Sequence, residues 1–160
     1  FATLDAPRAL LFTGLGLWLL IAVLNNIIDR GTNVFLLGIM FSMRLLKEDP
    51  QMGNGLKHRA IDDTRFHAVA LTVIVAIQFV VVAALLFAGL NYLLSWTGAP
   101  LSDPRGTGNA AAMAFGALWL FFMSGGLWFG YWMKQVQVQQ VHMTLLLFTF
   151  GLVVIVNLPG

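Results

Sequence analysis

The chain has 160 residues, of which 59% are hydrophobic and 10% are charged, and its formal net charge is +2. A soluble domain carries roughly a quarter charged residues, so this composition indicates an integral membrane protein. The chain has no cysteine, which excludes disulfides, thiolate metal sites and dithiol redox chemistry. No basic cluster is dense enough to bind nucleic acid, and we expect no nucleic-acid partner.

Four long apolar segments each reach the roughly 20 residues that a helix needs to cross the hydrocarbon. Backbone hydrogen bonds must be closed internally in lipid, so these segments are predicted to be helices. The predicted fold is a single all-α domain over residues 1–160, an integral membrane four-helix bundle. The second segment is longer than a crossing requires and should tilt or protrude. The expected spans are approximately 9–28, 66–96, 109–132 and 140–158.

A long polar connection, residues 29–65, separates the first two spans. Its thirty-seven residues hold eleven of the sixteen acidic and basic side chains. The apolar run 34–43 within it is too short to span, so we expect a short interfacial helix, with a re-entrant segment as the alternative. Counted with Lys134, this side carries seven Lys and Arg against two on the other, which places the connection in the cytoplasm.

Four polar side chains gather where the first span ends: Asn25, Asn26, Asp29 and Asn33. Residues four apart share a helix face, and Gly31 is a plausible point for the helix to stop. The favoured interpretation is a structural polar cluster that satisfies backbone groups freed at a helix end. The alternative is a buried cluster that binds a ligand or an ion.

The chain resembles a bacterial family of predicted small integral membrane proteins of unknown function. The resemblance rests on the order Asn25-Asn26-x-x-Asp29-x-x-x-Asn33, Phe35, Ser42-Met43, Arg59-Ala60-Ile61 and Gly125-Gly126-x-Trp128-Phe129. It covers nearly the whole chain, including the number of spans. It implies a four-helix membrane protein and little else, because the family has no established activity. The expected location is the bacterial cytoplasmic membrane.

Three positions depart from the family pattern. Ile39 stands where a His is usual, Arg44 where an acid follows Ser-Met, and Leu127 where an acid is expected before Trp128. The family also carries positive charge in its second connection, where this chain has Arg105 alone, so that the family orientation conflicts with the charge count. The lost polar groups favour a structural role for this chain.

Two histidines offer a cofactor hypothesis. His67 opens the second span and His142 lies near the start of the fourth, and both spans begin on the side of the long connection. Two imidazoles at similar depth could ligate haem b axially, although two ligand-free interfacial histidines are the favoured interpretation. Gln78 is the strongly polar side chain at the centre of the second span, where interhelical bonding is favoured over contact with a quinone or pigment.

Small residues spaced four apart predict close packing of helix backbones. The pairs are Ala84 and Ala88, Ala112 and Gly116, and Gly126 and Gly130. Packing within the chain is favoured over packing against another subunit.

No nucleophile elbow, phosphate loop or metal-binding triad appears, and no acid or lysine sits at mid-membrane. The predicted function is therefore non-catalytic: an accessory or assembly subunit of a larger respiratory, photosynthetic or oxidase complex, without a cofactor or metal of its own. Its partners would be membrane lipids and other membrane subunits. One alternative is a haem- or quinone-binding redox protein, with bound lipid or pigment as further options. Another is a small oligomeric transporter or channel with the cluster at its mouth.

Overall fold

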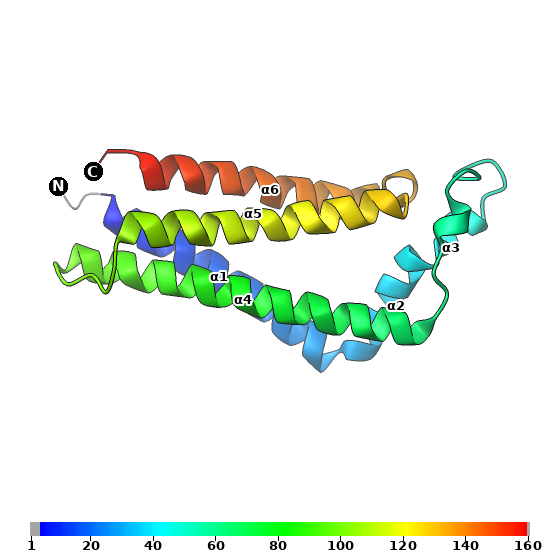
Figure 1. The fold of residues 1–160 in the computed structure, drawn as a ribbon, viewed down its shortest axis with the longest axis horizontal. Helices are drawn as coiled ribbons and strands as arrows, with labels where there is room; N and C mark the ends of the chain where they lie inside the picture. The colour runs from blue at the N-terminus through cyan, green and yellow to red at the C-terminus, as the bar shows by residue number, and fades with distance from the viewer. Residues whose placement is uncertain (1–3, 160) are drawn as a thin grey trace.

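The structure is a computed structural model that describes residues 4–159, and it is helical, with no strand in that range. Four of the helices within it are long and apolar enough to cross a membrane, which confirms the predicted all-α architecture and number of spans. Both ends of the described chain lie at the same end of the molecule (Figure 1). The four helices are α1 (Asp5–Ile28), α4 (Thr64–Trp96), α5 (Pro104–Trp128) and α6 (Val136–Asn157).

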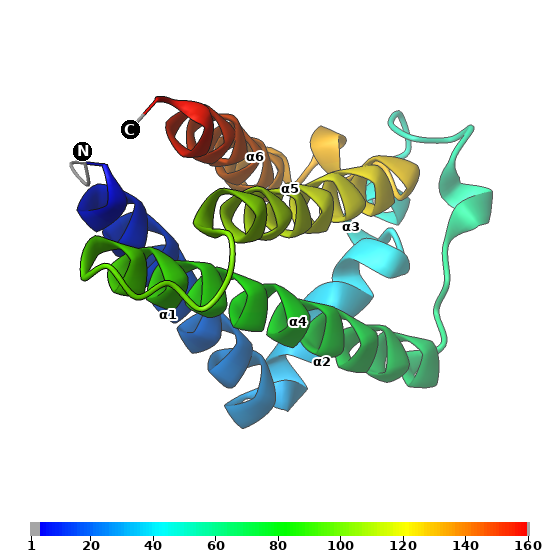
Figure 2. The ribbon, with the colours of Figure 1, turned by 60° about the vertical axis from the view of Figure 1, so that its left-hand side comes forward.

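The long helices pack in a chain of pairs rather than as a symmetric bundle. α1 packs extensively on α4, α4 on α5, and α5 on α6, whereas α1 and α6 contact each other little (Figure 2). Close approach depends on glycine: a Cβ on Gly16 of α1 would lie 2.7 Å from Leu86 of α4. The core of this bundle is apolar, with Phe12, Leu85 and Phe115 fully buried.

α4 is 33 residues long and extends past the end of α1. The extra turns are covered by α2 (Arg30–Phe41), which packs along the first part of α4. Arg30 ties the two helices together, because its Nη2 donates to the Ala68 carbonyl at 2.9 Å and to Thr72 Oγ1 at 2.8 Å. A helix thus lies within the long connection, and it begins four residues before the apolar run that predicted it.

The break between α1 and α2 falls at Asp29, and not at Gly31 as the sequence suggested. Asp29 leaves the helical conformation with φ −108° and ψ 55°, and its side chain accepts from the Thr32 amide at 3.4 Å. Gly31 lies inside α2. An acidic N-cap satisfies backbone amides that a glycine cannot, which explains why the helix restarts at this residue.

The remainder of the long connection forms short turns that close one end of the molecule. α3 (Arg44–Lys47) follows Met43, whose φ of 52° is left-handed, and η1 (Lys57–Arg59) precedes α4. Phe41, Met43 and Leu46 pack with Phe129 into a second apolar cluster. This cluster joins α2 and α3 to the link between α5 and α6.

The third span is shifted from its predicted position. α5 begins at Pro104, because Asp103 caps the Arg105 and Gly106 amides and proline suits the first helical position. It ends at Trp128, and the chain then turns at Gly130, whose φ is 68°. The turn η2 (Tyr131–Met133) leads into α6.

Candidate functional site

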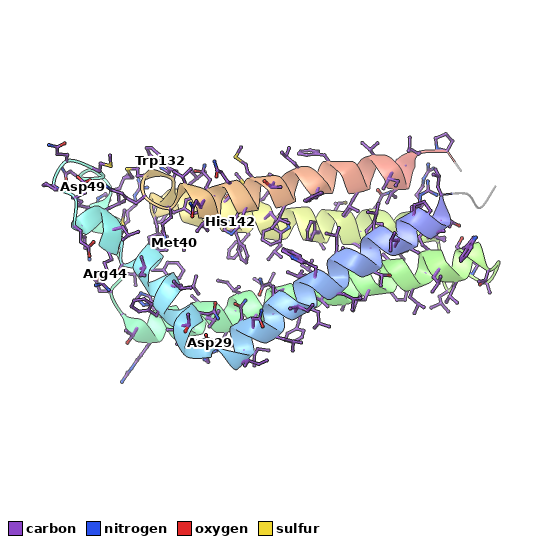
Figure 3. All side chains as sticks on the ribbon, turned by 180° about the vertical axis from the view of Figure 1, so that it is seen from behind. Asp29, Met40, Arg44, Asp49, Trp132 and His142 are labelled. Atoms are coloured by element: carbon purple, nitrogen blue, oxygen red, sulfur yellow. The ribbon has the colours of Figure 1, made fainter. Side chains whose placement is uncertain are left out.

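A cavity of about 320 Å³ lies toward the long-connection end of the bundle, and we call it the chamber. All four long helices and α2 contribute to its wall, so that α1, α2 and α4 face α5 and α6 across it. Figure 3 labels Met40 on α2 and His142 on α6 near this end of the molecule. The chamber is lined by Asn26, Asn33, Leu36, Leu37, Met40, Leu71, Ile74, Gln78, Phe122, Gln135, Val138 and His142.

Gln78 and Asn26 form the polar floor of the chamber. Gln78 is 5% exposed, and its Oε1 accepts a hydrogen bond from Asn26 Nδ2 at 3.1 Å. This bond joins α4 to α1, so the predicted interhelical partner of Gln78 exists. It leaves the two N–H donors of Gln78 Nε2 without a partner among the described residues. The spare donors of this buried amide therefore lie beside the cavity.

His142 lies in an aromatic setting on the opposite wall. Its ring centroid is 5.3 Å from that of Phe122, 5.8 Å from Trp119 and 6.0 Å from Tyr131. Three of these neighbouring rings each carry a buried polar atom with no hydrogen-bond partner among the described residues, namely His142 Nδ1, Trp119 Nε1 and Tyr131 Oη. Buried polar groups are nearly always satisfied, so this cluster calls for a water or ligand atom.

The residues of the predicted polar cluster serve two ends: some satisfy backbone groups at the break between α1 and α2, and some line the chamber. Asn33 Nδ2 donates to the Asp29 carbonyl at 2.8 Å and to the Asn25 carbonyl at 3.4 Å, which satisfies backbone groups at the break between α1 and α2. Asp29 caps α2, as described above. Asn26 and Asn33 also line the chamber. The sequence placed these residues together, and the structure adds the cavity that two of them face.

The two histidines of the haem hypothesis occupy different surroundings. His67 is 4% exposed, and its Nε2 lies 2.8 Å from the Ile61 carbonyl, to which it donates. Its Nδ1 is held against α2, since a Cβ on Gly38 would lie 2.8 Å from it. His67 lines a separate surface cavity, whereas His142 lines the chamber. Nor do residues 4–159 contain a group of three or more His, Asp or Glu placed to hold a metal.

The structure supports the predicted helix packing at two of the three small-residue pairs. Ala112 is fully buried and a Cβ on Gly116 would lie 2.7 Å from Thr149 of α6, so this pair packs α5 on α6. Ala84 and Ala88 belong to the apolar core or pack against it.

The prediction that Gly126 and Gly130 form a packing face between helices is wrong. Gly130 lies beyond the end of α5 in the left-handed conformation. Gly126 faces Tyr131 of the following turn, and a Cβ on Gly126 would lie 2.5 Å from the Tyr131 ring. The two glycines therefore shape the exit from α5.

Sequence reasoning missed Arg8, which lies at the opposite end of the bundle and is 7% exposed. Its Nε donates to the Ile155 carbonyl at 2.9 Å and its Nη2 to the Leu158 carbonyl at 2.8 Å, so that it caps the C-terminus of α6. Asp5 accepts from Arg8 at 3.2 Å and from Ser95 Oγ at 2.7 Å. The available signal was the i, i+3 spacing of Asp5 and Arg8 at a span's start.

An ion pair closes the loop side of the molecule. Lys134 Nζ lies 2.7 Å from Asp49 Oδ2, which joins the long connection to the link between α5 and α6. The Lys134 hydrogen bond, with those from the Gln51 and Met52 amides, holds the pKa of the Asp49 carboxyl below its usual range. Burial raises the pKa of the Tyr131 phenol, so that group stays protonated at neutral pH.

The fold and the chamber define a class: a small all-helical integral membrane protein with four candidate spans and a cavity between two helix pairs. The chain belongs to the DUF2165 family, described as predicted small integral membrane proteins, which it matches over residues 4–159. This confirms the resemblance drawn from the sequence. No curated protein and no solved structure shows a significant match to the chain.

Proposed function

We propose that the protein is a non-enzymatic binding protein that takes a small amphipathic molecule from the bilayer into the chamber. The observation that carries the proposal is the chamber itself, an apolar cavity into which a few polar side chains converge. Ligand sites are typically mostly apolar, with volumes of roughly 300–1,000 Å³ and a small number of placed polar groups.

The polar groups are costly in this setting unless they serve binding. A buried amide or imidazole in a membrane protein needs hydrogen-bond partners, and such residues mark ligand pathways by default. Gln78 has spare donors and His142 has a buried unpartnered nitrogen. A bound head group would satisfy both, which distinguishes the chamber from a simple packing defect.

The long connection suits the same role. α2 leaves Phe35 more than half exposed, while Leu36, Leu37 and Met40 line the chamber. Its 12 residues are too few to span the bilayer, and we place α2 at the membrane interface. There α2 would form the chamber's wall at the level of lipid head groups, with the bacterial cytoplasmic membrane as the expected location.

The test compares two tryptophan substitutions with a neutral photoreactive probe, a monoacylglycerol that carries an alkyl diazirine. Ile74 lines the chamber and Ile77, one turn along α4, is exposed on the exterior. We expect the wild-type protein in lipid nanodiscs to be labelled on chamber residues. Ile74→Trp should abolish that labelling because it fills the space, and Ile77→Trp should leave it intact. Labelling spread over the lipid-facing surface, equal in the three proteins, would contradict the proposal.

The accessory-subunit function remains a prediction. The exposed apolar faces of α1 and α6 suit lipid as well as they suit a partner helix, so they favour neither. Gentle purification in native lipid, followed by identification of co-purifying subunits, tests that role independently. The transporter or channel alternative likewise stays a prediction, and flux through reconstituted vesicles tests it.

A further inference from the structure

The side chains that line the chamber restrict the class of molecule that can bind there. Among the described residues that line it, none is Asp, Glu, Lys or Arg. A charged head group in such a site would be desolvated without a counterion, which strongly disfavours its binding. A zwitterionic or anionic phospholipid head is therefore a poor occupant, and the chemistry favours a neutral one.

The hydrogen-bond inventory specifies acceptor oxygens on the ligand. Asn26 Nδ2 uses one N–H on Gln78 Oε1, and Gln78 Nε2 keeps both of its own. On the facing wall, His142 lines the chamber and its buried Nδ1 has no hydrogen-bond partner among the described residues. A neutral imidazole carries one N–H, and with its proton on Nδ1 this atom is a donor. Donors thus lie on both sides of the space, and a molecule with an oxygen at each end of its head group would satisfy them.

The wall of the chamber also suits a flat ring. Phe122 and His142 both line it, with ring centroids 5.3 Å apart and planes inclined by 50°. Trp119 and Tyr131 support the imidazole from behind. Aromatic faces at this spacing pack well against a planar π-system, and a volume of about 320 Å³ holds one small ring system without a long chain.

We propose that the ligand is of the quinone class, which combines a neutral flat ring with two opposed carbonyl oxygens. This inference rests on the binding function proposed above and names its ligand. The carbonyls would accept from Gln78 Nε2 on one side and from His142 Nδ1 on the other. An isoprenoid tail would leave toward lipid between α1 and α6, which contact each other little along their lengths.

The test uses a matched pair of ring compounds, menadione and methylnaphthalene, which differ in the two carbonyl oxygens. Menadione also alkylates thiols, a side reaction that a cysteine-free chain avoids. Binding is measured by titration of the full chain in lipid nanodiscs. We expect menadione to bind about tenfold or more tightly than methylnaphthalene, because each hydrogen bond adds about a factor of five. Gln78→Leu should weaken menadione about fivefold, while Gln137→Leu, an exposed amide on α6 outside the chamber, should change nothing.

The outcomes separate this inference from the proposed function. Equal binding of both ring compounds would overturn the quinone assignment and leave a ring-binding chamber. Absence of menadione binding together with chamber labelling by the monoacylglycerol probe would also overturn it, and would leave the binding function standing. Failure of both probes at the chamber would overturn both proposals. A Gln78→Leu variant that folds, as judged by circular dichroism, and binds menadione like the wild type would refute the role given to Gln78.

Discussion

Two buried amides in α4 show how the same chemical group serves structure in one place and a site in another. Asn91 is fully buried and saturated: its Nδ2 donates to Ser102 and Thr107, and its Oδ1 accepts from the Leu101 and Ser102 amides. It fixes the turn between α4 and α5. Gln78 is also buried, yet both of its N–H donors are unused. These unused donors beside a cavity support the binding role proposed for Gln78.

Arg8 gives the clearest test of stability at the residue scale. Arg8→Met removes two charge-assisted bonds to the end of α6 and leaves the Asp5 carboxylate with Ser95 alone. We expect a loss of about 2–4 kcal/mol in the free energy of unfolding, measured by denaturant titration in mixed micelles. Arg105→Met is the matched control, because that exposed arginine makes one bond to the Asn157 carbonyl. A loss for Arg8→Met no larger than that of the control would contradict the capping role.

The sequence identified Gln78 and the Asn25–Asn33 cluster but not Asn91 or Arg8. A polar residue at mid-span stands out against lipid on composition alone. A polar residue near a span's end does not, because exposure to head groups is the default expectation there. Burial of Arg8 depends on the end of α6 lying beside it, a tertiary contact between residues 147 positions apart.

At the scale of elements, helix lengths follow the thickness of the hydrocarbon and helix ends follow local geometry. The spans were predictable because roughly 20 apolar residues are needed for each crossing. Their ends were not, since Asp29, Asp103 and Gly130 set them through caps and a left-handed φ. The 33 residues of α4 were expected to protrude, and α2 covers the part that extends past α1.

The pairing of α1 with α4 rests on a glycine contact. A Cβ on Gly89 would lie 2.9 Å from the Thr13 backbone N and 3.2 Å from its Cα, and backbone atoms cannot move aside. We expect Gly89→Ala to separate the two helices and to lower stability by about 1–3 kcal/mol. Gly14→Ala is the control, because nothing lies within 4 Å of a Cβ there. The control should be neutral or slightly stabilising, and thermal unfolding of both variants in the same detergent checks the comparison.

At the scale of the whole molecule, the chamber is a product of topology. Asn26 ends one span and Gln78 lies near the middle of the next, so no sequence pattern predicts that they meet. They meet because α1 stops about halfway along the longer α4. The wall from α5 and α6 comes from a second helix pair whose placement the sequence leaves open. The polar residues of the site were therefore foreseeable, and the cavity was not.

The ion pair that closes the loop side should depend on pH. The pKa of Asp49 is lowered in the folded protein, so the contact stabilises the loop above the usual aspartate pKa and is lost as pH falls through the folded value. We expect the Gln51 and Met52 amides, which donate to Asp49, to exchange faster in acid after correction for intrinsic rates. Asp49→Ala, which removes the side-chain acceptor, should show the fast exchange already at neutral pH. Exchange in the wild type that stays unchanged down to the most acidic pH at which the helices remain folded would contradict this pH dependence.

The orientation also belongs to this scale. The excess of Lys and Arg around residues 29–65 predicts that this end of the molecule faces the cytoplasm and that the turn between α4 and α5 faces outside. Because the chain has no cysteine, single substitutions report the topology directly. In intact cells we expect a membrane-impermeant maleimide to label Ser102→Cys and to leave Asn54→Cys unlabelled. Labelling of Asn54→Cys without labelling of Ser102→Cys would contradict this orientation and favour the opposite one, which the charge pattern of the family suggests.

The account as a whole depends on occupancy of the chamber, and native mass spectrometry of the protein released from its own membrane measures this most directly. The chamber predicts a neutral small-molecule adduct on the wild type and on Ile77→Trp, and its absence from Ile74→Trp, in which the cavity is filled. A wild-type protein that carries no adduct, or an adduct retained equally by Ile74→Trp, would contradict the account.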